Sequence, residues 1–380
     1  MGGAIGAFLA AAAMATGSAV TAAPAKADFE DLIDPIIQPI LTHLADALAG
    51  VDPSAAADLS SWTDSTFGSL SSFDPAAAVS STSDSVVAAS STPDAASGSY
   101  DIPITVQEDT EPSVQATIDG SNQTLLVDTG SSGLVVPWQD LGSSAHEVMR
   151  ALHESGAQYE GKGESGYSGG VDYRYREYDD VPVSYGNGEL DTNSPIDVVM
   201  HSHGTGHDSP KNFVQFDKDN DVTGILGIGD NTAGPTESPF ASLNYTGVTV
   251  DIPQGELVVD GNPGTAVATV DGAPITKLTE SIDGGTKVAV TDDVDSGGVY
   301  GTIPSSLVSG DSVPNDSLIS VYDGNTLLYD YYTGTDSLGD STAPIVVSGT
   351  SIDSGVEPYL EEPIYIDYAN DTLTFDQPVS

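Results

Sequence analysis

The chain has 380 residues, enough for two or three domains and a substantial core. Its 57 Asp and Glu residues against 9 Lys and Arg give a formal net charge of -48, which argues against nucleic acid as a partner because phosphate binding needs a cationic surface. Since the chain has no cysteine, disulfides and thiol catalysis are excluded. Charged residues make up 17% of the chain and apolar residues 38%, so a folded protein is expected.

The N-terminus predicts export. Residues 4–15 form an apolar run, and Ala25-Lys26-Ala27 is a small-x-small pattern that a signal peptidase would cut before Asp28. We therefore expect residues 1–27 to be a signal peptide, and the mature protein to be secreted, extracellular or held at the cell-envelope surface. The run is too short for a membrane span, and no span is expected later. A cytosolic Ala-rich tail is the alternative, because residues 1–3 carry no positive charge.

Two different segments follow. In residues 28–50 apolar residues recur at steps of three and four, which predicts an amphipathic helix that packs on its own protein or on a partner. Residues 51–99 are rich in Ser and Ala and contain no basic residue, which predicts a disordered linker.

From residue 100 onward the sequence predicts an all-β protein. Short apolar and β-branched runs follow one another at close spacing, separated by Gly, Pro, Asn and Asp, without a long helical pattern between them. A β domain over residues 100–378 is large, and we expect it to be bilobal, with lobes at about 100–240 and 241–378.

Two stretches place an acid directly after an apolar run, in Leu125–Pro137 and in Lys287–Ser306. A buried acid at a strand end has to be hydrogen-bonded, and the hydroxyls and glycines that follow supply donors and close backbone N–H groups. One such unit is more often a tight turn, but two in one β-rich chain form a repeat that a turn does not require. The residues concerned are Asp128, Thr129, Gly130 and Ser131 in the first unit, and Asp295, Ser296 and Gly297 in the second.

With these motifs the chain resembles the bilobal pepsin-like aspartic proteases, and most closely the exported mycobacterial ones found beside PE-type domains. The resemblance covers about residues 100–378. Val183–Gly188 resembles the flap hairpin of that family, with Tyr185 as the flap tyrosine and Gly186, Asn187 and Gly188 as its tip. Thr223–Gly229 is similar to the apolar strand that threads behind the first Asp loop, and Ile345–Gly349 would do the same behind the second.

The resemblance implies an aspartic endopeptidase that needs no metal or other cofactor. Each lobe would supply one Asp, and an extended peptide or protein substrate would bind between the lobes of a monomer as an added strand. Two carboxylates ~3 Å apart cannot both ionise cheaply, so the pair shares one proton and holds a base and an acid together. The ionised member takes a proton from water while the other donates to the peptide carbonyl.

The two units differ chemically. Ser131 can hydrogen-bond Asp128, whereas Gly298 offers Asp295 no hydroxyl. Because a hydroxyl bond stabilises the ionised form, we predict that Asp295 carries the shared proton. Val135 stands where the family often has a tryptophan that orients the flap tyrosine, and Trp138 is the candidate substitute.

Asp353 is the rival for the second dyad position, because Ser351–Gly355 contains another Asp-Ser-Gly. Polar and glycine residues precede it and no strand run follows, so we favour Asp295 and interpret Asp353 as a surface turn.

Three further patterns are weaker. His201, His203 and His207 lie in a Gly-rich segment that favours a mobile loop over a metal site. Asp217–Asp221 begins like a calcium loop but lacks the glycine and glutamate that an EF-hand needs. Gly161–Gly166 fits G-x-G-x-x-G without the strand and helix of a nucleotide site, and a flexible loop is expected.

The sequence thus favours a secreted aspartic endopeptidase that uses Asp128 and Asp295 and has its own linker as a candidate substrate. Two alternatives stay open: a catalytically silent binding protein on the same scaffold, and a surface adhesin.

Overall fold

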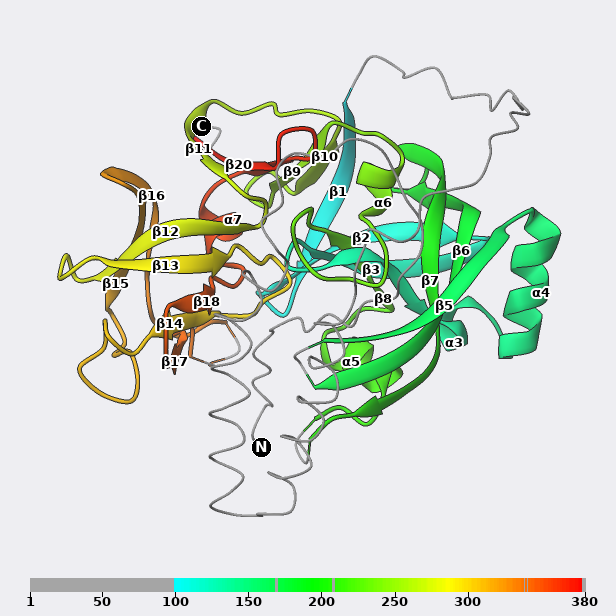
Figure 1. Cartoon of the computed structure of the whole chain (residues 1–380), viewed down its shortest axis with the longest axis horizontal. Coiled ribbons are helices and arrows are strands. Elements are labelled where there is room, and N and C mark those ends of the chain that lie inside the picture. The colour runs from blue at the N-terminus through cyan, green and yellow to red at the C-terminus, as the bar shows by residue number, and fades with distance from the viewer. Residues whose placement is uncertain (1–98, 168–169, 207–208, 338, 340, 378–380) are drawn as a thin grey trace, which may run out of the picture. The chain divides into compact units, whose positions relative to one another are not determined.

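Figure 1 shows the computed structural model of the chain, which describes residues 99–167, 170–206, 209–337, 339 and 341–377. The predicted signal peptide (1–27), the predicted helix (28–50) and all but the last residue of the predicted linker (51–99) lie outside the described residues. The described residues fold mainly into strands joined by short helices, which confirms the all-β prediction. No helix among them has the length and apolar character needed to cross a bilayer.

The first part of the fold holds strands β1 to β8 and helices α3 to α6. The strands are β1 (Tyr100–Gln107), β2 (Glu111–Ile118), β3 (Ser121–Asp128), β4 (Ser132–Pro137), β5 (Gln158–Tyr167), β6 (Val171–Tyr185), β7 (Leu190–Gly204) and β8 (Gly224–Ile228). The helices are α3 (Trp138–Leu141), α4 (Ala145–Ser155), α5 (Phe213–Asp219) and α6 (Pro239–Ser242).

The second part holds strands β9 to β20 and helix α7 (Glu357–Glu361), coloured from green to red in Figure 1. The strands are β9 (Gly247–Asp251), β10 (Glu256–Val259), β11 (Ala266–Asp271), β12 (Ile275–Ile282), β13 (Val288–Asp293), β14 (Thr302–Pro304), β15 (Leu318–Asp323), β16 (Thr326–Tyr332), β17 (Ile345–Val347), β18 (Ser351–Asp353), β19 (Ile364–Asp367) and β20 (Thr372–Asp376).

A 13-stranded sheet contains strands from both parts, in the order β11-β20-β19-β9-β10-β1-β2-β3-β8-β4-β7-β6-β5. Strand β1 joins them, because Tyr100–Pro103 pair with β10 while Ile104–Gln107 pair with β2. A separate five-stranded sheet has the order β16-β15-β12-β13-β18, and β14 pairs with β17. The predicted lobe boundary near residue 240 stays a prediction.

The same strand pairing occurs twice around the two Asp units. β3, which ends at Asp128, runs parallel to β8, with Leu126 opposite Ile225. β13, which precedes Asp295, runs parallel to β18, with Asp293 opposite Asp353. The repeat predicted from the sequence is therefore present in the strand topology.

The predicted role of Thr223–Gly229 is confirmed, but that of Ile345–Gly349 is wrong. Ile345–Val347 form β17, which pairs with β14, and β18 takes the place behind the second Asp unit instead. A close backbone approach explains the difference: a Cβ at Gly355 would lie 2.6 Å from Gly301 N. Only glycine lets the chain after β18 pass so near.

Two hydrophobic clusters fill the described fold. The larger contains residues of both parts, including Tyr185, Phe240 and Tyr359. The smaller is an aromatic cluster beneath the β5–β6 hairpin, where the rings of Tyr167 and Phe216 stack with centroids 5.7 Å apart. Leu126 and Ile225 belong to this cluster, so the strand pair behind Asp128 rests on an apolar layer.

Substitution of Gly227 tests whether β4 and β8 need their close approach. A Cβ there would lie 2.7 Å from the carbonyl carbon of Ser132, so Gly227→Ala should lower the free energy of unfolding by about 1–3 kcal/mol through overpacking. Gly310→Ala is the control, since its Cβ would enter open space. Urea unfolding of both variants measures the effect, and equal stabilities would contradict it.

Candidate active site

The structure brings Asp128 and Asp295 together. Each is almost completely buried, with 3% and 5% of its surface exposed. A Cβ at Gly130 would lie 2.5 Å from both carboxyl oxygens of Asp295, and a Cβ at Gly297 would lie 2.7 Å from Asp128 Oδ1. Each loop therefore crosses the carboxyl group of the other, and glycine is required at both crossings.

Reciprocal hydrogen bonds fix the two loops against each other. Thr129 N donates to Ser296 Oγ at 3.1 Å, and Ser296 N donates to Thr129 Oγ1 at 2.8 Å. Each hydroxyl also donates at 2.7 Å to the carbonyl that precedes the opposite Asp, Thr129 to Val294 O and Ser296 to Val127 O. All four bonds are buried, so the separation of the loops is tightly set.

Tyr359 of α7 adds a support that the sequence analysis missed. Its hydroxyl lies 2.9 Å from Thr129 Oγ1 and 2.8 Å from Val294 O, and its side chain is fully buried. A single Tyr in a five-residue helix gives no sequence signal, because only the tertiary fold brings it to the loops.

The two carboxyl groups are held by different donors. Ser131 Oγ donates to Asp128 Oδ2 at 2.5 Å. Asp295 Oδ1 accepts from two backbone groups, Gly130 N at 3.0 Å and Gly297 N at 2.8 Å.

Burial and then the charge of Asp295 raise the pKa of Asp128 well above its usual range. Burial also raises the pKa of Asp295, but the carboxyl of Asp128 and the backbone N–H donors oppose this. These directions favour the shared proton on Asp128, but the prediction that Asp295 carries it stays a prediction. Two backbone N–H groups stabilise ionised Asp295, whereas Ser131 and the backbone of Gly130 stabilise ionised Asp128.

The similarity of this chain to known proteins agrees with this geometry. Residues 100–374 match the model of the PE-PGRS C-terminal aspartyl peptidase-like domain. The chain belongs to this family. It is 35% identical over 301 residues to PE cleavage protein A of Mycobacterium tuberculosis and 34% identical to that of Mycobacterium marinum. In each case the match covers 73% of this chain but 52% of the relative, so the chain spans about half the length of these relatives.

Tyr185 of this peptidase-like domain does not lie where the sequence predicted. Gly186, Asn187 and Gly188 do form a turn, with φ of 60°, 60° and 101°. The Tyr185 side chain, however, is fully buried, and its ring lies 5.3 Å from that of Phe240. The alternation along β6 points Tyr185 into the core, so the prediction of a flap tyrosine at this position is wrong.

Tyr167 comes near the Asp pair instead. It ends β5, and the pKa of its hydroxyl is raised by burial, then by Tyr173 and by the charge of Asp128. In the sequence, the glycines that follow Tyr167 between two strand patterns could have indicated a hairpin turn at this place. Val135 packs in the same aromatic cluster, whereas Trp138 packs against the larger core.

Asp353 is not a surface turn. It ends β18 with 3% of its surface exposed, and its Oδ1 accepts a hydrogen bond from Gly355 N at 2.8 Å. The sequence prediction was wrong because β18 is only three residues long and too polar to be recognised as a buried strand.

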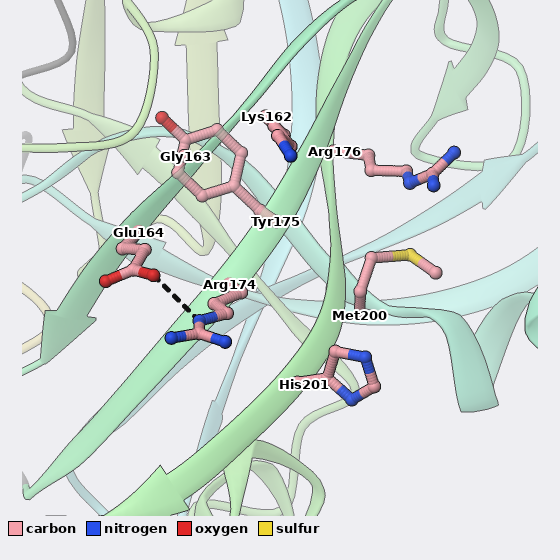
Figure 2. A pocket seen from close by; sticks show the side chains of 8 residues that line it. All are labelled: Lys162, Gly163, Glu164, Arg174, Tyr175, Arg176, Met200 and His201. Carbon is pink, nitrogen blue, oxygen red and sulfur yellow. Dashed lines mark ion pairs between the residues drawn. The ribbon is translucent and has the colours of Figure 1, made fainter.

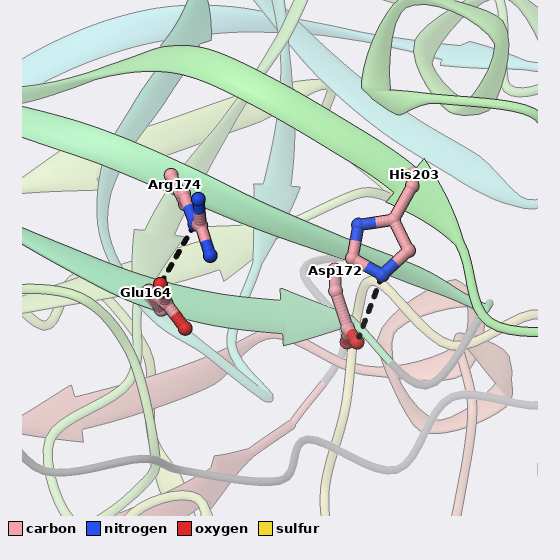
Figure 3. A network of polar contacts seen from close by, with 4 residues as sticks. All are labelled: Glu164, Asp172, Arg174 and His203. Carbon is pink, nitrogen blue, oxygen red and sulfur yellow. Dashed lines mark ion pairs between the residues drawn. The ribbon is translucent and has the colours of Figure 1, made fainter.

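His201 and His203 lie in strand β7 and not in a loop, while His207 is outside the described residues. Figure 3 shows His203 beside Asp172, with 3.9 Å between Nε2 and Oδ2. Asp217 and Asp219 lie in helix α5, which is not the geometry of a calcium loop. Within the described ranges no group of three or more His, Asp or Glu side chains could hold a metal ion.

The G-x-G-x-x-G pattern lies in β5, an edge strand, so the predicted flexible loop is also wrong. A shallow hollow of about 410 Å³ opens on β5, β6 and β7 (Figure 2). Arg174 in this hollow pairs with Glu164 at 2.7 Å, as Figures 2 and 3 show. Neither Asp loop contributes to the lining, which consists of Lys162, Gly163, Glu164, Arg174, Tyr175, Arg176, Met200 and His201.

Because several acids are buried, we expect the free energy of unfolding to fall as pH rises. The pKa values of Glu111, Asp292, Glu357 and Glu362 are raised to about 7, mainly by burial, from 4.5 for Glu and 3.8 for Asp. Between about pH 4 and 7 the folded state binds protons that the unfolded state has released. This contribution to stability is thus complete below about pH 4 and is lost as pH rises to about 7.

The free energy of unfolding, measured in urea at pH 4.5, 6 and 8, should decrease in that order. The Glu357→Gln variant should have a shallower slope, whereas Glu189→Gln, an exposed control, should keep the wild-type slope. High salt separates this effect from surface repulsion, which it screens. Stability that rises with pH, or equal slopes in the two variants, would contradict the assignment.

Proposed function

We propose that the chain is an aspartic endopeptidase in which Asp128 and Asp295 activate a water molecule held between them. The observation that carries the proposal is the buried contact of the two Asp loops, in which each glycine crosses the opposite carboxyl group. The sharing of one proton by this pair supplies an acid and a base at one place.

The donor pattern suggests which Asp does what. Asp295, held ionised by Gly130 N and Gly297 N, takes a proton from water as the water oxygen attacks the peptide carbonyl carbon. Asp128 gives its proton to the carbonyl oxygen, and a tetrahedral diol forms. The C–N bond then breaks as the amine nitrogen takes the proton from Asp295, while Asp128 recovers a proton from a diol hydroxyl. No cofactor takes part.

The proposed substrate is an extended polypeptide. Tyr167, and not Tyr185, would border it, because Tyr167 lies near Asp128. The name of the relatives, PE cleavage protein A, supports substrates of the PE type. In this proposal the enzyme is a monomer, is exported by residues 1–27 and works outside the cell or at the cell-envelope surface.

Substitution of either Asp tests the chemistry. Asp128→Asn and Asp295→Asn should each lower cleavage of a mixed peptide library by about 10³-fold or more, because each removes one proton-transfer group. Asp217→Asn is the matched control, since Asp217 is a buried acid in α5 outside both loops. A statine peptide, which mimics the tetrahedral state, should inhibit the wild type. Peptide binding without cleavage would overturn the proposal in favour of a silent binding protein.

Self-cleavage is a separate prediction. Residues 51–99 lack basic residues and have the composition of a flexible segment, which suits an extended substrate. The wild-type chain should acquire a new N-terminus within this segment, and Asp128→Ala should keep the longer form. N-terminal sequencing of both proteins, with Asp217→Asn as control, measures this. The same N-terminus in the wild type and in Asp128→Ala would contradict self-cleavage.

A further inference from the structure

The two halves of the site differ at two matched positions. Ser131 follows Asp128 at the third place, whereas Gly298 holds that place after Asp295. In the strand behind each loop, Ile225 lies opposite Leu126 in the first half, and Asp353 lies opposite Asp293 in the second. The second half thus lacks a hydroxyl in the loop and has a carboxyl in the strand behind it.

These two differences meet in space. A Cβ built at Gly298 would lie 2.8 Å from Asp353 Oδ1 and 3.0 Å from Gly355 Cα. The carboxyl of Asp353 therefore fills the space that a side chain at 298 would need, and the N–H of Gly355 holds it there at 2.8 Å. In the first half the corresponding space contains Ser131 Oγ, which donates to Asp128 Oδ2.

We propose that the carboxyl group of Asp353, in its neutral form, replaces the missing hydroxyl at position 298 and donates a hydrogen bond to the outer oxygen, Oδ2, of Asp295. Asp353 is then a positioning residue that stabilises the ionised member of the pair. This inference rests on the proposed function, because it assigns a role to Asp353 in the same site.

The surroundings keep Asp353 neutral. Burial raises its pKa well above the usual range, followed by the charge of Asp295. The other groups that face it are also acidic or neutral: Asp292 and Asp293 on β13, Asp128 across the loops, and Thr302 on β14. A carboxyl among acids retains its proton and becomes a donor.

The test introduces the residues of the first half at the matched positions of the second half. Three variants are made in the full chain: Asp353→Ile, Gly298→Ser, and both together, which reproduces the pair Ile225 and Ser131. Asp353→Asn is the conservative variant, since its amide can still donate. Asp217→Asn is again the control for the loss of a buried acid. The readouts are kcat/KM against pH and the midpoint of thermal unfolding.

Asp353→Ile should lower kcat/KM roughly ten-fold and move the acid limb of the pH profile up by about one unit, as expected for the loss of one hydrogen bond to a charged group. Gly298→Ser should also lose activity, because its Cβ meets Asp353. The double variant should recover both the rate and the acid limb relative to either single variant, and Asp353→Asn should move the acid limb much less than Asp353→Ile.

An acid limb that stays in place in Asp353→Ile while only the unfolding midpoint falls would mean a purely structural role and overturn the inference. A double variant that shows only the sum of the two single losses would overturn it as well. If the wild type cleaves no peptide, the proposed function fails, yet the inference is still measurable. In that case carboxyl ¹³C NMR, with the Asp295 signal assigned from Asp295→Asn, should report a higher pKa in Asp353→Ile than in the wild type.

Discussion

The site depends on keeping two acidic side chains in contact where water would normally separate them. Repulsion between two buried carboxylates and their loss of hydration both oppose this contact. Bonds between the loops hold it, in which Thr129 and Ser296 exchange backbone and hydroxyl hydrogen bonds. Because Gly130 and Gly297 carry no Cβ, the backbone can cross each carboxyl closely enough for its N–H groups to offset part of the cost. Retention of one proton removes most of the remaining repulsion.

The two halves of the site use one topology with opposite surroundings. Behind Asp128, Leu126 and Ile225 join the aromatic cluster that contains Tyr167. Behind Asp295, the matched positions are Asp293 and Asp353, and burial raises the pKa of both well above the usual range. The apolar side supports the hairpin that brings Tyr167 to the pair, while the acidic side places behind the pair two carboxyls whose pKa values burial raises. The asymmetry separates these two tasks, and it places Asp292, one of the acids that stabilise the fold at low pH, in the strand that precedes Asp295.

The sequence predicted features that contiguous residues determine. An Asp at the end of an apolar run, followed by a hydroxyl and a glycine, specifies its loop locally, so Asp128 and Asp295 could be found without coordinates. Tyr185 and Asp353 were misjudged because their places depend on partners distant in sequence. Tyr185 faces Phe240 through the alternation of β6, and the chain after β18 passes close to Gly301 because residue 355 is a glycine. The register between two distant strands cannot be predicted from the sequence of either strand alone.

The hydrogen-bond donors around the two carboxyls show how backbone and side chain divide the control of such a pair. The sequence comparison counted hydroxyls, and by that count Asp128, with Ser131, is the better stabilised anion. The structure adds two N–H donors to Asp295, from Gly130 and Gly297, and neither residue has room for a side chain where the loops meet. These N–H groups stabilise the ionised form of Asp295, while Ser131 stabilises that of Asp128. The balance between the two carboxyls therefore depends on the close approach of the loops, because the glycines that permit the contact also bring backbone donors to Asp295.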